Sequence, residues 1–346
     1  MQIFLGSLLC VVAGVCVGVF LLPLKFSRAW KWENSWLVGA FFMYVFFPVL
    51  SLYLVVPRFA DIYAETPWRD IALIFLFGLV QGTGSYVFTY GTTLLGLALG
   101  YALMIGAISL VSLLVPLFGA HLDRLGKLDG IALVAGFVIL VAGIALAGRA
   151  GILRQRKLER AGEGSKISLG LTCAVIIWAG IANSLFYFTF EFQKAMKDIA
   201  VTRYGVPEHF WGFLNILPFM LGMFTVNLVL TVAKMVREQT LRNFWASPGL
   251  VREYILGFTI GLLWYLGQGV CYTAGHTYLG PLGVAVGAAL FMGAMMVASN
   301  VAGIHMGEWA GAGPSTMRVL YAAITVLVIA MSVIAVGNYL QQKMAA

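Results

Sequence analysis

Charged residues are scarce in this sequence. They make up 10% of its 346 residues, against about 25% in soluble proteins. Hydrophobic residues account for 61%, and the mean hydropathy is +0.93. This composition is poorly compatible with a soluble enzyme, a nucleic-acid-binding protein or a disordered chain. It predicts a multi-pass membrane protein, since ten bilayer crossings of ~20 residues use about 200 residues and leave about 146 for loops and helix ends.

Cysteines and catalytic motifs are also few. The four cysteines, Cys10, Cys16, Cys173 and Cys271, lie in apolar stretches without CxxC or CxxH spacing, so neither a disulfide framework nor a metal site is expected. We interpret them as small apolar residues. No nucleophile–base pair and no ATP-binding motif stands out. The sequence therefore predicts neither an enzyme nor a cofactor, and an ion gradient would have to drive any transport.

Ten long apolar runs predict ten transmembrane helices. A bilayer offers backbone groups no water, so such runs form helices unless they close a barrel, and short alternating strands are absent from the sequence. The expected fold is all-α. The N-terminal run lacks the basic start and cleavage site of a signal peptide and is interpreted as a retained helix. The predicted helices are residues 2–24, 35–56, 71–92, 97–119, 130–148, 168–190, 209–233, 253–275, 281–304 and 317–340.

Basic residues concentrate in the odd-numbered connections between these helices. Cytoplasmic loops of membrane proteins collect Lys and Arg, so we attribute the net charge of +8 to orientation rather than to nucleic-acid binding. The bias predicts a cell inner-membrane protein with both termini outside the cytoplasm. Eight of the 22 basic residues lie elsewhere, and the other 14 are Lys25, Arg28, Lys31, Arg149, Arg154, Arg156, Lys157, Arg160, Lys166, Lys234, Arg237, Arg242, Arg252 and Arg318.

The two halves of the chain carry signs of an inverted repeat. Residues 89–96 read TYGTTLLG and residues 273–280 read TAGHTYLG, with five identities at a constant offset of 184. Five helices per half would place the second copy inverted in the membrane, as in many secondary transporters. We therefore predict a first five-helix repeat over residues 1–148, a basic cytoplasmic linker over 149–167 and a second repeat over 168–346.

Four stretches resemble the L-rhamnose–proton symporter family of the drug/metabolite transporter superfamily. They are PLKFSRAWKWENSW (23–36), FGLVQGTGSY (77–86), GLLWYLGQGVCYTAGH (261–276) and GEWAGAG (307–313). The similarity extends through nearly all the chain at low identity. It implies a ten-helix inverted repeat with both termini outside, which takes up a deoxysugar with a proton. Glu191 falls where the family has an acid, and the residues that match its pattern are Lys25, Trp32, Glu33, Trp36, Gly82, Gly84, Trp264, Tyr265, His276, Glu308 and Trp309.

Two departures from the family pattern concern the substrate. Gln81 stands where an aromatic residue is expected, and residues 281–304 lack the family's polar and aromatic residues. These differences favour a related sugar such as L-fucose beside L-rhamnose. Alternatives with the same fold are a metabolite exporter and a sodium-coupled sugar carrier. An intramembrane enzyme acting on lipid-linked sugar would need paired acids or a metal cluster, which the sequence does not show.

Polar residues near the bilayer middle are the candidates for sugar binding. Such groups are costly in membrane helices and are functional candidates by default, although each can instead bond a neighbouring helix. Gln81 and Ser85 share a helix face, and under the 184-residue offset Gln81 is equivalent to Tyr265 and Gly84 to Gln268. Lys25 has a simpler interpretation as an interfacial lysine. The predicted sugar contacts are Lys25, Gln81, Ser85, Tyr86, Trp178, Asn183, Tyr187, Trp264, Tyr265, Gln268 and Tyr272.

Three titratable residues are candidates for carrying the coupled proton. Glu191 lies between two phenylalanines, and burial against aromatic rings favours a protonated carboxyl. It can alternatively be an interfacial acid paired with Lys194. Glu33 lies near three basic residues, and a structural ion pair is the simpler interpretation. His276 either relays protons or caps and packs its helix.

Overall fold

The computed structural model describes residues 2–95, 108, 126–160 and 169–345, and these are helices and their connections. Within them, eight helical segments are long and apolar enough to cross a membrane, which confirms an all-helical, multi-pass membrane protein. The predicted helix at 97–119 lies almost wholly outside the described residues. The eight candidate spans are Gln2–Phe26, Trp32–Val55, Trp68–Tyr90, Gly130–Arg154, Gly212–Glu238, Leu250–Leu279, Gly283–His305 and Gly313–Met344.

Most long helices coincide with the predicted runs. Helix α8 covers the sixth of them. The long helices are α1 (Gln2–Val19), α5 (Trp68–Leu95), α7 (Leu128–Arg160), α8 (Leu169–Phe192), α10 (Gly212–Glu238), α14 (Gly283–His305) and α15 (Gly313–Ala345). Short elements join them: η1 (Leu22–Phe26), α4 (Phe59–Glu65), α9 (Lys194–Asp198), η4 (Ile199–Arg203) and α11 (Asn243–Ala246).

Two spans are interrupted by π-helical turns. The second span consists of α2 (Trp32–Phe41), the π-helical η2 (Phe42–Phe46) and α3 (Phe47–Val55). Pro48 follows η2, and a proline cannot donate the backbone hydrogen bond that a regular helix needs there. The other span runs through α12 (Leu250–Trp264), the π-helical η5 (Tyr265–Tyr272), α13 (Thr273–Gly275) and η6 (His276–Leu279). Such π turns occur often at functional sites.

The basic stretch after the fifth predicted helix is partly helical. Helix α7 continues to Arg160, well past the predicted end at residue 148. Residues 152–160 are mainly Leu, Arg, Gln, Lys and Glu, which are strong helix formers and include no Gly or Pro. The first part of the predicted linker therefore extends the helix instead of forming a loop.

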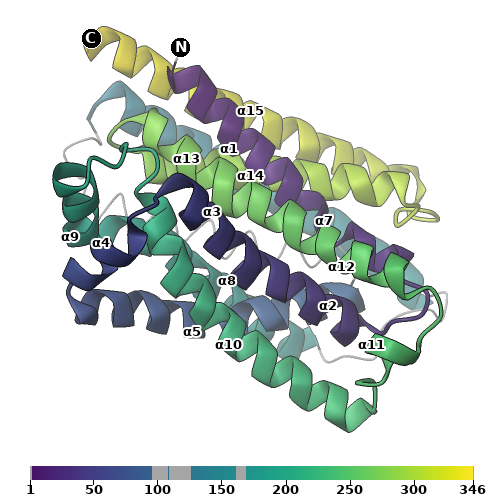
Figure 1. The fold of residues 1–346 in the computed structure, drawn as a ribbon. Coiled ribbons are helices and arrows are strands. Elements are labelled where there is room, and N and C mark those ends of the chain that lie inside the picture. Colours follow the sequence, from purple (N-terminus) through teal and green to yellow (C-terminus); the bar gives the residue numbers. More distant parts are fainter. Residues whose placement is uncertain (1, 96–107, 109–125, 161–168, 346) are drawn as a thin grey trace.

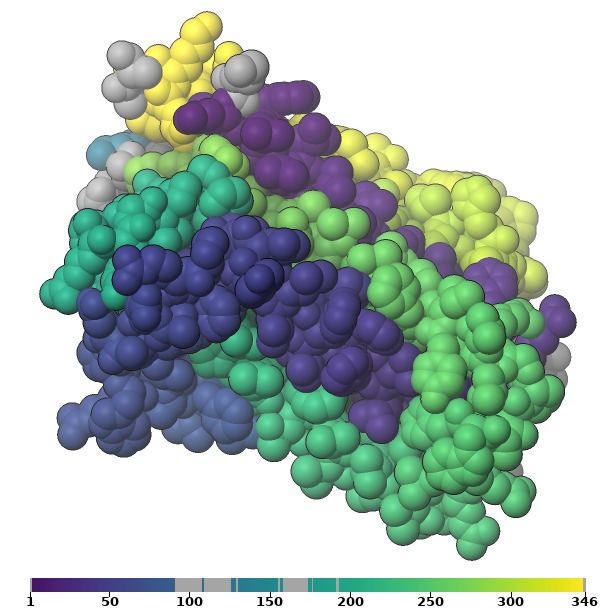
Figure 2. Space-filling view, in the orientation of Figure 1, coloured from purple at the N-terminus to yellow at the C-terminus, as the bar shows by residue number. Residues whose placement is uncertain are grey.

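Helices from the first and second halves of the chain pack against each other throughout the bundle. Helix α7 lies along α15, α5 packs on α10 and α8, and α12 packs on α2. Helix α1 packs on α14 and η5, and Figure 1 shows α1 and α14 between the α7–α15 pair and the α5–α10 pair. Both chain ends lie at one end of the bundle. In Figure 2 the purple N-terminal helices share one face with the green and yellow C-terminal ones.

Glycines allow two of these helix pairs to cross closely. A Cβ on Gly78 of α5 would lie 2.0 Å from a backbone oxygen of α10, and one on Gly222 of α10 would lie 2.2 Å from a backbone oxygen of α5. In the α12–α2 pair, a Cβ on Gly261 would lie 2.9 Å from the Gly39 carbonyl oxygen. Small residues let membrane helices approach to backbone contact. These crossings hold the helices that surround the centre of the bundle.

Candidate functional site

A cavity lies in the centre of the bundle, where helices of both halves meet. Its volume is about 50 Å³, below the roughly 300–1,000 Å³ typical of small-molecule sites, so the surrounding helices would have to move apart to admit a sugar. Six of the predicted sugar contacts line it: Gln81, Ser85, Asn183, Tyr187, Trp264 and Gln268. The other lining residues are Val17, Phe20, Trp36, Tyr44, Phe88, Thr89, Ile108, Met223, Phe291 and Met295.

Hydrogen bonds join the polar side chains of the lining across helices. The Gln81 Oε1 atom accepts a hydrogen bond of 3.1 Å from the Phe186 backbone N–H. A side-chain amide keeps two N–H donors when its oxygen is engaged, so Gln81 can donate to a sugar hydroxyl. The Tyr187 hydroxyl hydrogen-bonds the Gln268 side chain. α5, α8 and η5 thus bring three residues predicted from the sequence to one place.

Aromatic rings form a second part of the lining. The Trp36 Nε1–H donates to Asn227 Oδ1 over 3.0 Å, and the Asn227 amide donates to the carbonyl oxygen of Met223 on its own helix over 2.9 Å. Trp264 meets the Tyr44 ring edge-on, with centroids 5.3 Å apart. Fixed ring faces beside amide groups can hold a ligand that has both C–H faces and hydroxyls.

Sequence reasoning did not select Trp36, Tyr44 or Thr89 as sugar contacts, yet all three line the cavity. For each of these residues, a feature of the sequence could have indicated its place in the lining. Trp36 belongs to the first of the family-like stretches, and Thr89 begins the repeated TYGTTLLG sequence. Tyr44 carries a hydroxyl in an otherwise apolar run, and this hydroxyl is hydrogen-bonded to Ser85 Oγ over 2.8 Å. A buried hydroxyl in a membrane helix requires such a partner.

Two predicted tyrosines bond neighbouring helices outside the cavity lining. The Tyr265 hydroxyl contacts Ser51 Oγ, and its ring stacks on Phe47 with centroids 5.7 Å apart. The Tyr272 hydroxyl donates to the Val284 carbonyl oxygen over 3.1 Å. Both rings are buried. They occupy the interhelical role that the sequence left open as the alternative to sugar binding.

Three further predicted contacts also lie away from the cavity lining. Trp178 is 46% exposed, and its Nε1–H donates to Thr83 Oγ1 over 3.0 Å. Tyr86 meets the Trp32 ring edge-on. Lys25 forms an ion pair with Glu308. The chain segment after α1 is therefore joined to the connection between α14 and α15, at the end of the bundle opposite the termini.

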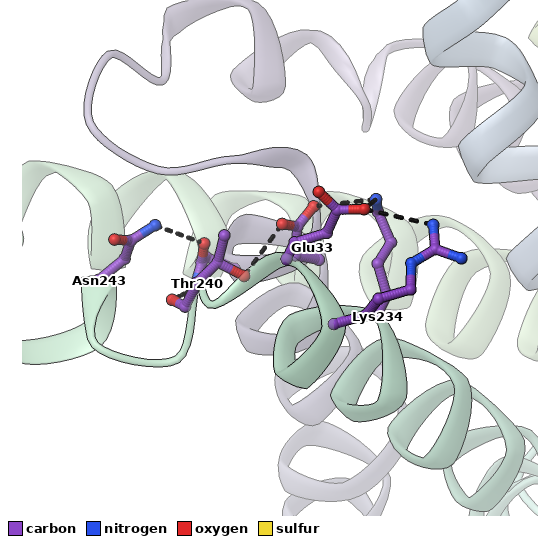
Figure 3. Close-up of polar contacts among 7 residues, drawn as sticks. Glu33, Lys234, Thr240 and Asn243 are labelled. Carbon is purple, nitrogen blue, oxygen red and sulfur yellow. Dashed lines mark hydrogen bonds and ion pairs between the residues drawn. The ribbon is translucent and has the colours of Figure 1, made fainter.

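Of the three proton candidates, the structure describes two side chains. Glu33 is 2% exposed, its Oε1 accepts a hydrogen bond of 3.0 Å from Thr240, and its Oε2 lies 3.9 Å from Lys234 Nζ, as Figure 3 shows. His276 is buried, with Nδ1 3.1 Å from the Tyr272 carbonyl oxygen. Glu191 belongs to α8, but its side chain lies outside the described residues. Glu33 thus pairs with Lys234 of α10 and not with the three basic residues near it in the sequence.

Metal-ligating side chains do not gather in the described part of the chain. No group of three or more His, Cys, Asp or Glu residues that could hold a metal ion occurs there. Cys10 and Cys271 are free and buried, and Cys16 is free and partly buried. The chemistry that the described cavity offers is hydrogen bonding by amides and hydroxyls, together with contact against aromatic and aliphatic surfaces.

Comparison with known proteins gives one consistent result. Residues 1–340 match the family described as L-rhamnose-proton symport protein (RhaT). The chain is 26% identical over 344 residues to the L-rhamnose-proton symporter of Escherichia coli O1:K1, covering 97% of this chain and 98% of the relative. Symporters of the same name from Escherichia coli O127:H6 and Shigella boydii serotype 18 match with the same identity and coverage.

Proposed function

This chain belongs to the L-rhamnose-proton symport family, and we propose that it takes up the deoxysugar L-rhamnose together with a proton by alternating access. Membership makes it a transporter and not an enzyme. The observation that carries the proposal is the central cavity, which combines amides, hydroxyls and aromatic rings from both halves of the chain. A largely enclosed, mixed lining of this kind is typical of small-molecule sites.

The polar and the aromatic lining residues suit the two kinds of surface on a deoxysugar. The side chains of Gln81, Asn183 and Gln268 offer donors and acceptors to hydroxyl groups. Trp36 and Trp264 offer ring faces to the C–H face of the pyranose. The apolar lining residues Phe88, Met223, Phe291 and Met295 would accommodate the methyl group that distinguishes a deoxysugar.

The packing of the helices supports two inverted five-helix repeats. Under the 184-residue offset, the third and eighth helices are equivalent, and so are the second and seventh. The α5–α10 pair then has the α2–α12 pair as its counterpart, α5–α8 has η5–α1, and α7–α15 is its own counterpart. Such paired contacts are what an inverted repeat produces. We place the Lys25 end of the bundle in the cytoplasm and both termini outside.

We assign the coupled proton to Glu191. Glu33 is occupied by Lys234 and Thr240, and His276 by a backbone carbonyl and aromatic rings. Glu191 follows Asn183 and Tyr187 at i+8 and i+4 on the same helix face, and both of those line the cavity. Coupling requires the sugar to bind more tightly when this carboxyl is protonated, and linkage makes that relation reciprocal.

The test is uptake of radiolabelled L-rhamnose and L-fucose into proteoliposomes with an imposed pH gradient. Wild type is expected to accumulate L-rhamnose, and Glu191→Gln to lose accumulation while keeping downhill exchange. The exposed Glu208 provides the matched control, since Glu208→Gln should accumulate sugar like wild type. Accumulation that follows a sodium gradient at fixed pH would contradict proton coupling. No uptake of either sugar by folded, inserted protein would contradict the substrate and favour an exporter.

A further inference from the structure

A ladder of aromatic rings leads from the central cavity toward the Lys25 end of the bundle. Trp36, which lines the cavity, stacks on Trp32 with centroids 5.9 Å apart and an interplanar angle of 12°. Trp32 in turn meets Tyr86 and Tyr90 edge-on, at 5.5 and 5.2 Å. These two tyrosines stack on each other at 6.4 Å. The four rings come from α2 and α5 and form one continuous surface.

One hydrogen-bond donor within this ladder has no acceptor among the described residues. The Trp32 Nε1 atom is buried and finds no hydrogen-bond partner in the part of the chain that the structure describes. A buried N–H without a partner is unfavourable, and most such groups in folded proteins are satisfied. The Tyr90 ring, by contrast, is 37% exposed. The ladder therefore offers an accessible ring surface beside a donor that lacks an acceptor.

Charged groups flank the far end of the ladder. Lys234 Nζ lies 5.3 Å from the centroid of the Tyr90 ring. The same ammonium is 3.9 Å from Glu33 Oε2 and 3.8 Å from Glu238 Oε1, and Figure 3 shows Glu33 between Lys234 and Thr240. A cation and carboxylates beside aromatic faces supply strong donors and acceptors next to apolar surface. Those are the groups that bind a polyhydroxylated ring.

We propose that Trp32, Tyr86 and Tyr90, with Lys234 held in place by Glu33, form a second sugar-binding subsite between the central cavity and the cytoplasmic face. Its ligand is a neutral pyranose, which stacks on the exposed Tyr90 ring and accepts a hydrogen bond from Trp32 Nε1. The subsite receives the sugar when it leaves the central cavity. This inference rests on the proposed sugar transport and adds a binding step on one side of the membrane.

An aromatic belt at the membrane interface would explain Trp and Tyr residues at this depth without a ligand. Two observations favour the subsite. Belt residues hold their polar atoms in the headgroup region, whereas the Trp32 N–H is buried. The neighbouring Glu33 carboxylate is buried as well, at 2% exposure. The Trp32 donor and Glu33 therefore lie in the interior of the protein, while the Tyr90 ring beside them is exposed.

The test compares the KM for L-rhamnose from each side of the membrane, in right-side-out and inside-out vesicles. Trp32→Ala should raise the cytoplasmic-side KM about ten-fold through the lost stacking and donor, and leave the outer-side KM within about two-fold. Trp32→Phe keeps a ring and lacks the N–H, so it should give a smaller one-sided increase. Trp30→Phe is the matched control, because Trp30 packs on Phe244 and Tyr254 outside the ladder.

The outcomes separate this subsite from the proposed function. Equal increases on both sides would make Trp32 a part of the central site and overturn the subsite. An unchanged cytoplasmic-side KM in both Trp32 variants would overturn it as well, with transport itself intact. If Trp32→Ala fails to fold, the cytoplasmic-side KM of Trp32→Phe alone tests the subsite. Absence of rhamnose transport by wild type would instead contradict the proposed function.

Discussion

At the scale of single residues, buried carboxylates connect parts of the chain that are far apart in sequence. Glu253, in the first turn of α12, accepts hydrogen bonds from Ser27 Oγ at 2.6 Å and from the backbone N–H groups of Arg28 and Ala29 at 3.0 and 3.1 Å. It thereby holds the connection between η1 and α2. Glu308 does the same for the end of η1 through Lys25. These acids fix the Lys25 end of the bundle.

Replacing Glu253 should destabilise the protein strongly. Glu253→Ala leaves the backbone donors at residues 28 and 29 without their acceptor, which costs about 2 kcal/mol or more. Glu253→Gln keeps one acceptor oxygen and should cost less. Thermal unfolding in detergent measures both. Glu208→Gln is the control, because Glu208 is in an exposed ion pair with Lys197, and such pairs contribute little. Equal unfolding temperatures for Glu253→Ala and Glu208→Gln would contradict this role.

The exposed Glu65 gives a pH-dependent contribution. The hydrogen bond from the Tyr204 hydroxyl and then the one from Arg203 hold the pKa of Glu65 below its ordinary value. A lowered folded-state pKa stabilises the fold above the unfolded value of about 4.3, and this stabilisation disappears as the pH falls through the folded value. Wild type should therefore unfold at a higher temperature than Glu65→Gln at pH 6, with the difference shrinking as the pH falls through the lowered folded-state pKa of Glu65. A difference that grows on acidification would contradict the assignment.

Some residues selected from the sequence line the cavity and others do not, for a physical reason. Gln81, Asn183 and Gln268 lie near the middle of their predicted helices, and all three line the cavity. Depth in the membrane follows from position along a helix. The direction in which a side chain points around the helix axis cannot be predicted in the same way, because these helices are apolar on all sides. Trp178 was expected in the site with Asn183 and Tyr187 of the same helix, and it is 46% exposed outside the cavity lining.

At the scale of helices, close crossings depend on glycine. Helices α5 and α10 meet at Gly78 and Gly222, where added Cβ atoms would overlap backbone oxygens. Backbone atoms cannot move aside as a flexible side-chain end can. The long apolar runs predicted these helices well. The π-helical turns η2 and η5 were not predicted, since they follow from how neighbouring helices pack and not from a periodic pattern.

Adding one methyl group at the α5–α10 crossing should therefore be costly. Gly222→Ala is expected to lower the free energy of unfolding by about 1–3 kcal/mol through overpacking, and to reduce transport because both helices line the cavity. Gly126→Ala is the control, since nothing lies within 4 Å of a Cβ at that position. Chemical unfolding and counterflow measure the two effects. A Gly222→Ala protein as stable and active as the control would show that the helices can separate without loss.

At the scale of the whole molecule, the two chain ends lie at the same end of the bundle. Lys25, Lys234 and Arg154 belong to the opposite end, where α1, α10 and the span of α7 finish. From the positive-inside rule we therefore predict that both termini lie outside. A C-terminal alkaline phosphatase fusion should be active in intact cells, and the same enzyme inserted after Arg156 should be inactive. The reverse pattern would invert the orientation and exchange the two faces in the subsite proposal.

The central claim is that sugar binds in the cavity shared by the two halves. Counterflow of radiolabelled L-rhamnose in proteoliposomes, with Gln268→Ala beside Thr259→Val, tests it most directly. Both positions belong to one membrane span, but Gln268 lines the cavity, whereas Thr259 is partly buried outside the lining and its hydroxyl donates to the Ile255 carbonyl oxygen of its own helix. We predict that Gln268→Ala raises the KM about ten-fold or more while Thr259→Val matches wild type. Identical KM values for both variants and wild type would contradict the account.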